Sequence, residues 1–290
     1  MSQMNESRCG HSIGPDTAVM LAAGRGARLE QASGGVPKPL IQVAGQTLAE
    51  RAVVSLQVGG RIERVIVCVG HEAEAVTGHF DELGRRYGLA IECVTVSDWP
   101  LGNGTSALAA RERLGRETFL LSMTDHIFDP DIARMLVSYP LQPDEMALAI
   151  DRNKDGIFDL EDVTRVRFEN GGILAIDKNL EEWDAADTGV MICSRGLFDG
   201  LERAAAKDRH GLSDGLRELA KQRRAKTVDV TGRYWIDVDT PEAHREAENQ
   251  SIVRAAFDAR PGSLDPLYDA TYRLGFAAGR MANGIRKFLA

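Results

Sequence analysis

The sequence predicts an α/β protein with a mostly parallel sheet, an antiparallel insertion and a helical C-terminal tail. Two observations in the first half of the chain support this fold class. Short apolar runs alternate with helical patterns from Thr17 onward, which is typical of βαβ units. The apolar runs are continuous, as at residues 18–22, and such runs are typical of strands buried on both faces of a parallel sheet.

The first half of the chain is expected to supply parallel strands with helices between them. Strands are expected at residues 18–22, 64–69, 91–96 and 118–123, and helices at 47–58, 73–87 and 106–114. The last strand runs directly into Thr124, Asp125 and His126. Because parallel sheets bind ligands at the carboxyl ends of their strands, we expect Asp125 and the glycine-rich loop after residue 22 to lie at a binding site.

After Met146 the pattern changes, and short turns between the expected strands indicate an antiparallel excursion. Strands are expected at residues 146–150, 164–168, 173–176 and 190–193, followed by a helix at 213–224 and a strand at 226–230. The string WIDVD (235–239) then leads into a helix with Thr240 as its N-cap and Pro241 at its first position, a typical helix start.

Length and composition divide the chain into three parts and exclude several classes of protein. We expect a loose leader at 1–16, one domain at 17–250 and a helical appendage at 251–290. The net charge of −8 argues against a nucleic-acid-binding protein, which usually carries a basic patch. The four cysteines form no CxxC pair, and no apolar stretch approaches the ~20 residues of a membrane span. A cytoplasmic protein without structural zinc, disulfides or a signal peptide is therefore expected.

The most specific motif is LAAGRGARL at residues 21–29, followed by PKP at 37–39. A buried strand that ends in Gly-x-Gly lets backbone N–H groups approach a triphosphate closely, because glycine has no Cβ. Arg28 and Lys38 supply the positive charge that such a site requires. The string is not a dinucleotide-binding fingerprint, since Leu29 stands where a third glycine is needed, and no GK[ST] follows as in a P-loop.

Further strings share one pattern with this motif: GNGTS (102–106), MTDH (123–126), DKNL (177–180), DTG (187–189) and WIDVDTP (235–241). Together they resemble the nucleotidyltransferase family that activates sugar phosphates, from about Thr17 to about Glu248. Within that family the strings are most similar to inositol-1-phosphate cytidylyltransferases, while phosphonate and phosphocholine cytidylyltransferases share much of the pattern. The resemblance implies a Rossmann-like, GT-A-like sheet.

The resemblance also implies a reaction: transfer of CMP from CTP to a phosphorylated polyol, with inositol 1-phosphate as the acceptor, releasing pyrophosphate and a CDP-alcohol. Two alternatives stay open. One is the same chemistry on a phosphonate, phosphocholine or a hexose 1-phosphate, and the other is a nucleotide-binding regulatory subunit without turnover. The acceptor phosphate is already an anion at pH 7, so the chemistry needs charge neutralisation and positioning in place of a general base.

Mg²⁺ is the expected cofactor, because it prefers carboxylate and phosphate oxygens. Asp125 and Asp239, each at the tip of an expected strand, are the natural pair of ligands, and the two corresponding motifs hold the metal in the resembling family. An isolated aspartate at a strand end can also be a helix cap. Asp237 alternates with Asp239 and is expected to point the same way, as a second ligand or an orienting partner.

The remaining site residues follow from the resemblance. Arg28, Lys38 and Asp125 are the expected catalytic residues; the expected nucleotide-binding residues are Leu21, Ala22, Ala23, Gly24, Gly26, Asn103, Gly104 and Thr105; the expected acceptor-binding residues are Lys178, Asp187, Thr188 and Gly189. Plainer interpretations exist for several of them: an ordinary loop at 102–104, a surface lysine at 178 and a turn at 187–189. His126 either contacts a phosphate or is a structural neighbour of Asp125.

Two segments invite other interpretations. Residues 151–162 match a Ca²⁺-binding EF-hand loop, but Asp162 replaces the final glutamate, and the flanks have strand patterns where helices are required. We expect a solvated acidic hairpin loop instead. Residues 251–290 carry six basic and three acidic residues, and 264–290 has an amphipathic pattern. This tail is expected to be a peripheral membrane contact, a homodimer helix or a helix packed on its own domain.

Overall fold

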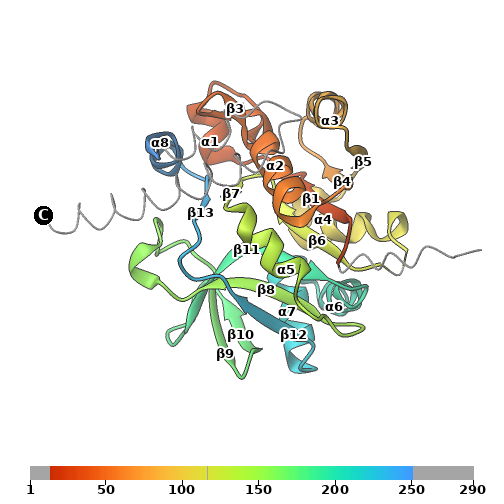
Figure 1. Ribbon diagram of the computed structural model, residues 1–290, viewed down its shortest axis with the longest axis vertical. Coiled ribbons are helices and arrows are strands. Elements are labelled where there is room, and N and C mark those ends of the chain that lie inside the picture. The colour runs from red at the N-terminus through yellow and green to blue at the C-terminus, as the bar shows by residue number, and fades with distance from the viewer. Residues whose placement is uncertain (1–13, 116, 251–290) are drawn as a thin grey trace, which may run out of the picture.

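A nine-stranded sheet forms the centre of the protein in the computed structural model, which describes residues 14–250 except residue 116 (Figure 1). The strand order is β5-β4-β1-β6-β11-β8-β12-β10-β9. The first half of the chain supplies β1 (Thr17–Ala22), β4 (Arg64–Val69), β5 (Ala90–Thr95) and β6 (Phe119–Met123), which pair in parallel. These four strands lie within one residue of the predicted bounds.

Helices cover both faces of the sheet, as the continuous apolar strands predict. One face carries α2 (Leu48–Gly60), α3 (Ala73–Tyr87) and α5 (Pro130–Val137), and the other carries α4 (Asn103–Ala109), α6 (Gly196–Ala205) and α7 (Leu212–Lys221). Alternate residues of β1 pack into different cores: Ala18 and Met20 contact the first layer, while Val19 and Leu21 contact the second. Period-2 alternation therefore buries every side chain of this strand.

The second half of the chain adds the predicted antiparallel part of the sheet. Its strands are β8 (Met146–Asp151), β9 (Arg165–Glu169), β10 (Gly172–Asp177), β11 (Ala185–Cys193) and β12 (Ala225–Asp229). β11 runs antiparallel to β6 and β8, and β9 pairs antiparallel with β10, whereas β12 is parallel to β8. The predicted strand at 190–193 is wrong at its start, because β11 begins at Ala185 and includes residues 187–189.

Two-stranded ribbons and short helices complete the frame of the site. β7 (His126–Phe128) pairs antiparallel with β13 (Trp235–Asp237), and β2 (Gln42–Val43) with β3 (Gln46–Thr47). The short helices are α1 (Ala27–Ala32), η1 (Lys38–Leu40), η2 (Trp99–Leu101), η3 (Arg111–Arg113) and η4 (Lys154–Gly156). The segment at 235–239 thus reaches the site beside the large sheet, through its pairing with β7.

The helix predicted after Thr240 is confirmed as α8 (Pro241–Asn249), with the Thr240 hydroxyl accepting from the N–H of Ala243 at 3.1 Å. Three α-helices of the described residues have no counterpart among the predicted ones: α1, α5 and α6. The signal for α5 lay in Asp129-Pro130, because the Asp129 carboxylate caps the helix by accepting from the N–H of Asp131 at 2.9 Å and proline suits a first helical position.

The leader, apart from residues 14–16, and the tail at 251–290 lie outside the described residues. The loose-leader, membrane-contact and dimer hypotheses for these segments therefore stay predictions. None of the helices within residues 14–250 combines the length and the apolar character that a membrane span requires.

Candidate active site

A cleft of about 270 Å³ opens at the carboxyl end of β6. Its walls come from segments far apart in the sequence: the end of β6, the loop after β8, the end of β10, the first half of β11, and the connection from β13 to α8. Parallel strands direct their carboxyl ends to one edge, where helix N-termini and loops meet. The position predicted from the strand order is therefore where the structure places a cleft.

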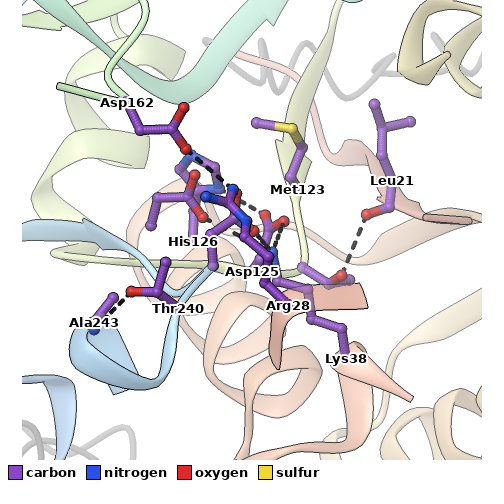
Figure 2. A network of polar contacts seen from close by, with 12 residues as sticks. Leu21, Arg28, Lys38, Met123, Asp125, His126, Asp162, Thr240 and Ala243 are labelled. Carbon is purple, nitrogen blue, oxygen red and sulfur yellow. Dashed lines mark hydrogen bonds and ion pairs between the residues drawn. The ribbon is translucent and has the colours of Figure 1, made fainter. Parts of the chain in front are cut away.

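Lys38 is buried, with 5% of its surface exposed, and its ammonium group faces a cluster of aspartates. Its Nζ lies 2.6 Å from Oδ2 of Asp125, donates to Oδ1 of Asp239 and lies 4.0 Å from Oδ1 of Asp237. Figure 2 shows Lys38 and Asp125 in this network. A buried lysine is stable only when it is paired, and here three carboxylates surround it.

Gly26 makes room for Lys38 at the glycine-rich loop. Its φ is +62°, and a Cβ at this position would lie 2.5 Å from Cδ of Lys38. Gly24, in contrast, has nothing within 4 Å of a built Cβ. The two glycines of the motif therefore have different roles, because only Gly26 is required by contacts within the described residues.

Asp125 is held at the site from two sides. The N–H and hydroxyl of the preceding Thr124 donate to the carbonyl of Leu21 at 3.2 and 3.3 Å, which fixes the end of β6 against β1. Nδ1 of His126 lies 2.7 Å from Oδ1 of Asp125. Burial alone would raise the pKa of Asp125, but Lys38 and His126 outweigh it and hold this pKa well below its usual range. Asp125 is therefore ionised at neutral pH.

His126 contacts Asp125, as one of the two hypotheses for it requires, and it also lines the cleft, so a contact with a phosphate stays a prediction. Burial by itself would lower the pKa of His126, but Asp237, Asp125 and Asp187 raise it to about 9. The ring packs on Gly189, where φ is +76° and a Cβ would lie 2.3 Å from Cδ2 of His126. Gly189 thus leaves the space that the imidazolium fills.

Replacing Gly189 with alanine is expected to reduce the free energy of unfolding by about 3 kcal/mol, because left-handed strain and overpacking against His126 act together. The measurement is urea unfolding of the variant. Gly171→Ala is the matched control: its φ is +75°, but nothing lies within 4 Å of its Cβ, so it is expected to lose only about 1–2 kcal/mol. Equal losses in the two variants would contradict the packing argument.

The aspartate cluster is suited to a divalent cation. Within residues 14–250, candidate ligand atoms of Asp125, His126 and Asp237 lie within 4.8 Å of one another. The two aspartates are the suitable donors, because His126 is protonated at neutral pH. Oδ1 of Asp237 is buried and has no hydrogen-bond partner. Burial raises the pKa of Asp237, Asp125 adds to the effect, and His126 and Lys38 oppose it. A buried carboxylate oxygen that accepts no hydrogen bond and lies near other carboxylates is chemically suited to Mg²⁺.

The structure brings the two predicted metal ligands together and adds a third carboxylate. Asp125 and Asp239 share Nζ of Lys38, so their carboxylates lie within reach of one ion. Asp237, which the sequence ranked below Asp239, lines the same cleft with its buried oxygen. The donor set for a cation is therefore wider than the predicted pair.

Arg28 and Lys178 face a carboxylate that sequence reasoning missed. Nη2 of Arg28 lies 3.0 Å from Oδ2 of Asp239 and 3.1 Å from Oδ2 of Asp162, and Nζ of Lys178 lies 2.6 Å from Oδ1 of Asp162. The flanks of the acidic loop are the strands β8 and β9, which confirms that it is no EF-hand. The loop is largely exposed, as expected, and Asp162, whose side chain is 34% exposed, additionally pairs with two cations of the site.

The segment predicted to contact the nucleobase is the beginning of helix α4. Asn103 and Gly104 are its first residues, and a Cβ on Gly104 would lie 2.7 Å from the carbonyl oxygen of His210. The N–H of Gly104 donates to that carbonyl at 2.9 Å, and Oδ1 of Asn103 accepts from the N–H of Leu212 at 2.6 Å. The hydroxyl of Thr105 lies 3.4 Å from Nδ1 of His210.

These contacts narrow the prediction that residues 103–105 bind the nucleotide. Gly104 and Thr105 join α4 to the segment before α7, and only Asn103 of the three lines the cleft. The amide nitrogen of Asn103 lies 3.9 Å from the sulfur of Met123, at the same wall. A direct nucleotide contact thus fits the Asn103 amide and does not fit the N–H of Gly104, which is already bonded.

Residues 187–189 divide between the two faces of β11. Asp187 and Gly189 line the cleft, whereas Thr188 is fully buried and its hydroxyl donates to the carbonyl of Ala149 at 2.9 Å. The predicted acceptor contact through the Thr188 hydroxyl is therefore wrong, because that side chain faces the protein core. One carboxylate oxygen of Asp187 accepts from the N–H of Gly189 at 2.7 Å.

Residues 21–23 do not line the cleft, although the carbonyl of Leu21 accepts from the N–H of Thr124 beside it. Leu21, Ala22 and Ala23 are buried, and the carbonyl of Ala23 accepts from the N–H of His71 at 3.0 Å. The next residue, Gly24, is exposed and has no heavy atom within 4 Å of a built Cβ. A ligand could therefore approach the backbone at Gly24.

A glycine-rich loop after β1, a buried lysine and aspartates at the ends of β6 and β13 define a nucleotide-transferring class of α/β protein. The chain belongs to the MobA-like NTP transferase family, whose domain matches residues 18–227. This confirms the resemblance inferred from the motifs.

Two curated relatives carry the same name. The chain is 38% identical over 240 residues to the bifunctional IPC transferase and DIPP synthase of Rubrobacter xylanophilus, covering 82% of this chain and 52% of the relative. It is 32% identical over 241 residues to the protein of that name from Aquifex aeolicus, covering 83% of this chain and 53% of the relative. The chain thus spans about half the length of these relatives.

Solved structures confirm the predicted fold class. The inositol-1-phosphate CTP transferase from T. maritima superposes with a TM-score of 0.71 at 22% identity, over 81% of this chain and 97% of that one. A UDP-glucose pyrophosphorylase complexed with UDP-glucose gives a TM-score of 0.66 at 18% identity, over 81% and 97% of the two chains.

Proposed function

We propose that the protein is a Mg²⁺-dependent cytidylyltransferase that transfers CMP from CTP to inositol 1-phosphate and releases pyrophosphate. The observation that carries this proposal is the convergence of three cations, Arg28, Lys38 and Lys178, on aspartates at one cleft. The names of the relatives, IPC transferase and inositol-1-phosphate CTP transferase, support the choice of substrates.

Different residues of the chain are suited to the two substrates, CTP and the acceptor phosphate, both of which are anions. Arg28 follows the glycine-rich loop and Lys38 lies beside Gly26, so both are suited to the pyrophosphate of CTP. Lys178, which follows β10, lines the cleft and is suited to the acceptor phosphate, for which a flexible point charge is appropriate.

Asp125, Asp237 and Asp239 would hold Mg²⁺. The ion supplies neutralisation of the nucleotide phosphates and orients them for in-line transfer. The acceptor phosphate is the nucleophile and is an anion at neutral pH, so none of these aspartates needs to act as a general base. Asp125 is ionised at neutral pH because of Lys38 and His126, which is the state that a metal ligand requires.

The acceptor side of the cleft is suited to a polyol. Asp187, Thr164 and Asp159 line it, and carboxylate and hydroxyl oxygens can accept hydrogen bonds from ring hydroxyls. Asp187 is oriented by the N–H of Gly189 at 2.7 Å, so this carboxylate is held in place before the acceptor binds.

The proposal is tested by measuring pyrophosphate release with CTP, UTP, ATP and GTP, each with inositol 1-phosphate, glucose 1-phosphate, phosphocholine or a phosphonate. We expect the fastest release with CTP and inositol 1-phosphate, and loss of release when EDTA removes Mg²⁺. Faster release with another acceptor would contradict the acceptor assignment. No release with any pair would favour a regulatory subunit.

A further inference from the structure

Asp162 bridges the two cations that the proposed function assigns to different substrates. Its Oδ2 lies 3.1 Å from Nη2 of Arg28, and its Oδ1 lies 2.6 Å from Nζ of Lys178. Figure 2 shows its carboxylate directed at the guanidinium of Arg28. The two oxygens of one carboxylate thus contact a cation on α1 and a cation that follows β10.

The bridge uses the same donors that a phosphate would use. Arginine and lysine bind carboxylates and phosphates through similar charge-assisted hydrogen bonds. A phosphate oxygen that approaches Arg28 or Lys178 therefore competes with Asp162. The hydrogen bond from Lys178, together with Arg28, lowers the pKa of Asp162, so the carboxylate is charged at neutral pH.

Asp162 lies on an exposed segment that a ligand could displace. The segment joins β8 to β9 and contains only the single-turn helix η4. The side chain of Asp162 is 34% exposed, and its neighbours Phe158 and Leu160 are 46% and 41% exposed. Few buried apolar contacts hold such a segment, so its displacement costs little.

We propose that Asp162 is a placeholder for substrate phosphate, which pairs with Arg28 and Lys178 before substrates bind and is displaced when either phosphate arrives. This inference rests on the phosphate roles of Arg28 and Lys178 in the proposed function. Because one carboxylate engages both cations, the substrate that displaces it frees the second cation for the other substrate. The affinities of CTP and of the acceptor are thereby coupled, and such coupling is reciprocal.

The direct test is calorimetric binding of inorganic pyrophosphate to the wild-type protein, Asp162→Asn and Glu161→Gln. Asp162→Asn is expected to bind pyrophosphate about five- to tenfold more tightly, because it lacks the partly exposed carboxylate that competes for Arg28 and Lys178. Glu161 is exposed and contacts no cation within the described residues, so Glu161→Gln removes the same charge one residue away. Glu161→Gln is expected to change the dissociation constant of pyrophosphate by less than about twofold, because water and salt screen an exposed charge.

The coupling is tested with inositol 1-phosphate and α,β-methylene-CTP, whose α-phosphate cannot be transferred with loss of pyrophosphate. In the wild-type protein the analogue is expected to tighten inositol 1-phosphate binding several-fold, and in Asp162→Asn this effect is expected to disappear. Unchanged or weaker pyrophosphate binding in Asp162→Asn would overturn the inference. If inositol 1-phosphate binds to neither protein, the proposed acceptor is wrong, while the pyrophosphate measurement still decides the role of Asp162.

Discussion

Asp125→Ala is expected to lower the rate of pyrophosphate release by about three orders of magnitude, because electrostatic stabilisation of the transferring phosphate and metal binding both depend on this carboxylate. The fold is expected to persist. Lys38 keeps Asp239 and Asp237 as partners, and Thr124 still attaches the end of β6 to Leu21. The measurements are steady-state pyrophosphate release and circular dichroism.

Asp229→Ala is the matched control for Asp125→Ala. Asp229 is also at the carboxyl end of a strand, β12, but it lies outside the cleft, where it pairs with Arg152 at 3.8 Å. This variant is expected to retain wild-type turnover. Wild-type turnover in a well-folded Asp125→Ala protein would show that the cleft at β6 is not where transfer occurs.

The sequence was sufficient for the parallel half of the fold because its strands are short, mainly apolar runs between turn residues, although β5 contains Glu92. β4 and α3 match their predicted bounds at both ends. The antiparallel half was harder. β11 was predicted to begin at residue 190 because Gly189 and polar neighbours interrupt its apolar pattern, yet it begins at Ala185. A glycine with φ +76° inside a strand marks a bulge, and this bulge is where His126 packs.

The error at Thr188 follows from the same interruption. Alternate residues of a strand face opposite sides, so a strand that includes residues 187–189 places Asp187 and Gly189 on one face and Thr188 on the other. Without that strand, the three residues were treated as one binding loop. In the structure the Thr188 hydroxyl donates to Ala149 on the core side.

The central cluster could be predicted, and the contact of Asp162 with it could not. Arg28, Lys38, Asp125 and Asp239 lie in motifs whose residue types match the chemistry of phosphates and cations, and the structure brings them together. Asp162 is 134 positions from Arg28, in a loop whose composition is typical of solvated segments. Its contact depends on how the loop after β8 is placed over the sheet, which no local pattern specifies.

The position of Lys38 allows its effect on catalysis to be distinguished from its effect on metal binding. Its Nζ contacts the same aspartates that would hold Mg²⁺. Its ammonium group contacts Asp125 and Asp239 and lies 4.0 Å from Asp237. A metal ion and Lys38 therefore compete for negative charge, while both are needed to neutralise the triphosphate. Removal of the lysine is expected to affect turnover and metal affinity in opposite directions.

Lys38→Met retains the chain length at this buried position and removes the charge. Pyrophosphate release is expected to fall by about two to three orders of magnitude, as for loss of one preorganised electrostatic group. Mn²⁺ binding to the protein without nucleotide, measured by electron paramagnetic resonance, is expected to become tighter, since three carboxylates lose their competing cation. Lys226→Met is the control: it breaks the 3.2 Å pair with Glu145 outside the cleft and is expected to leave both quantities unchanged. Weaker Mn²⁺ binding in Lys38→Met would mean that Lys38 organises the aspartates for the metal and does not compete with it.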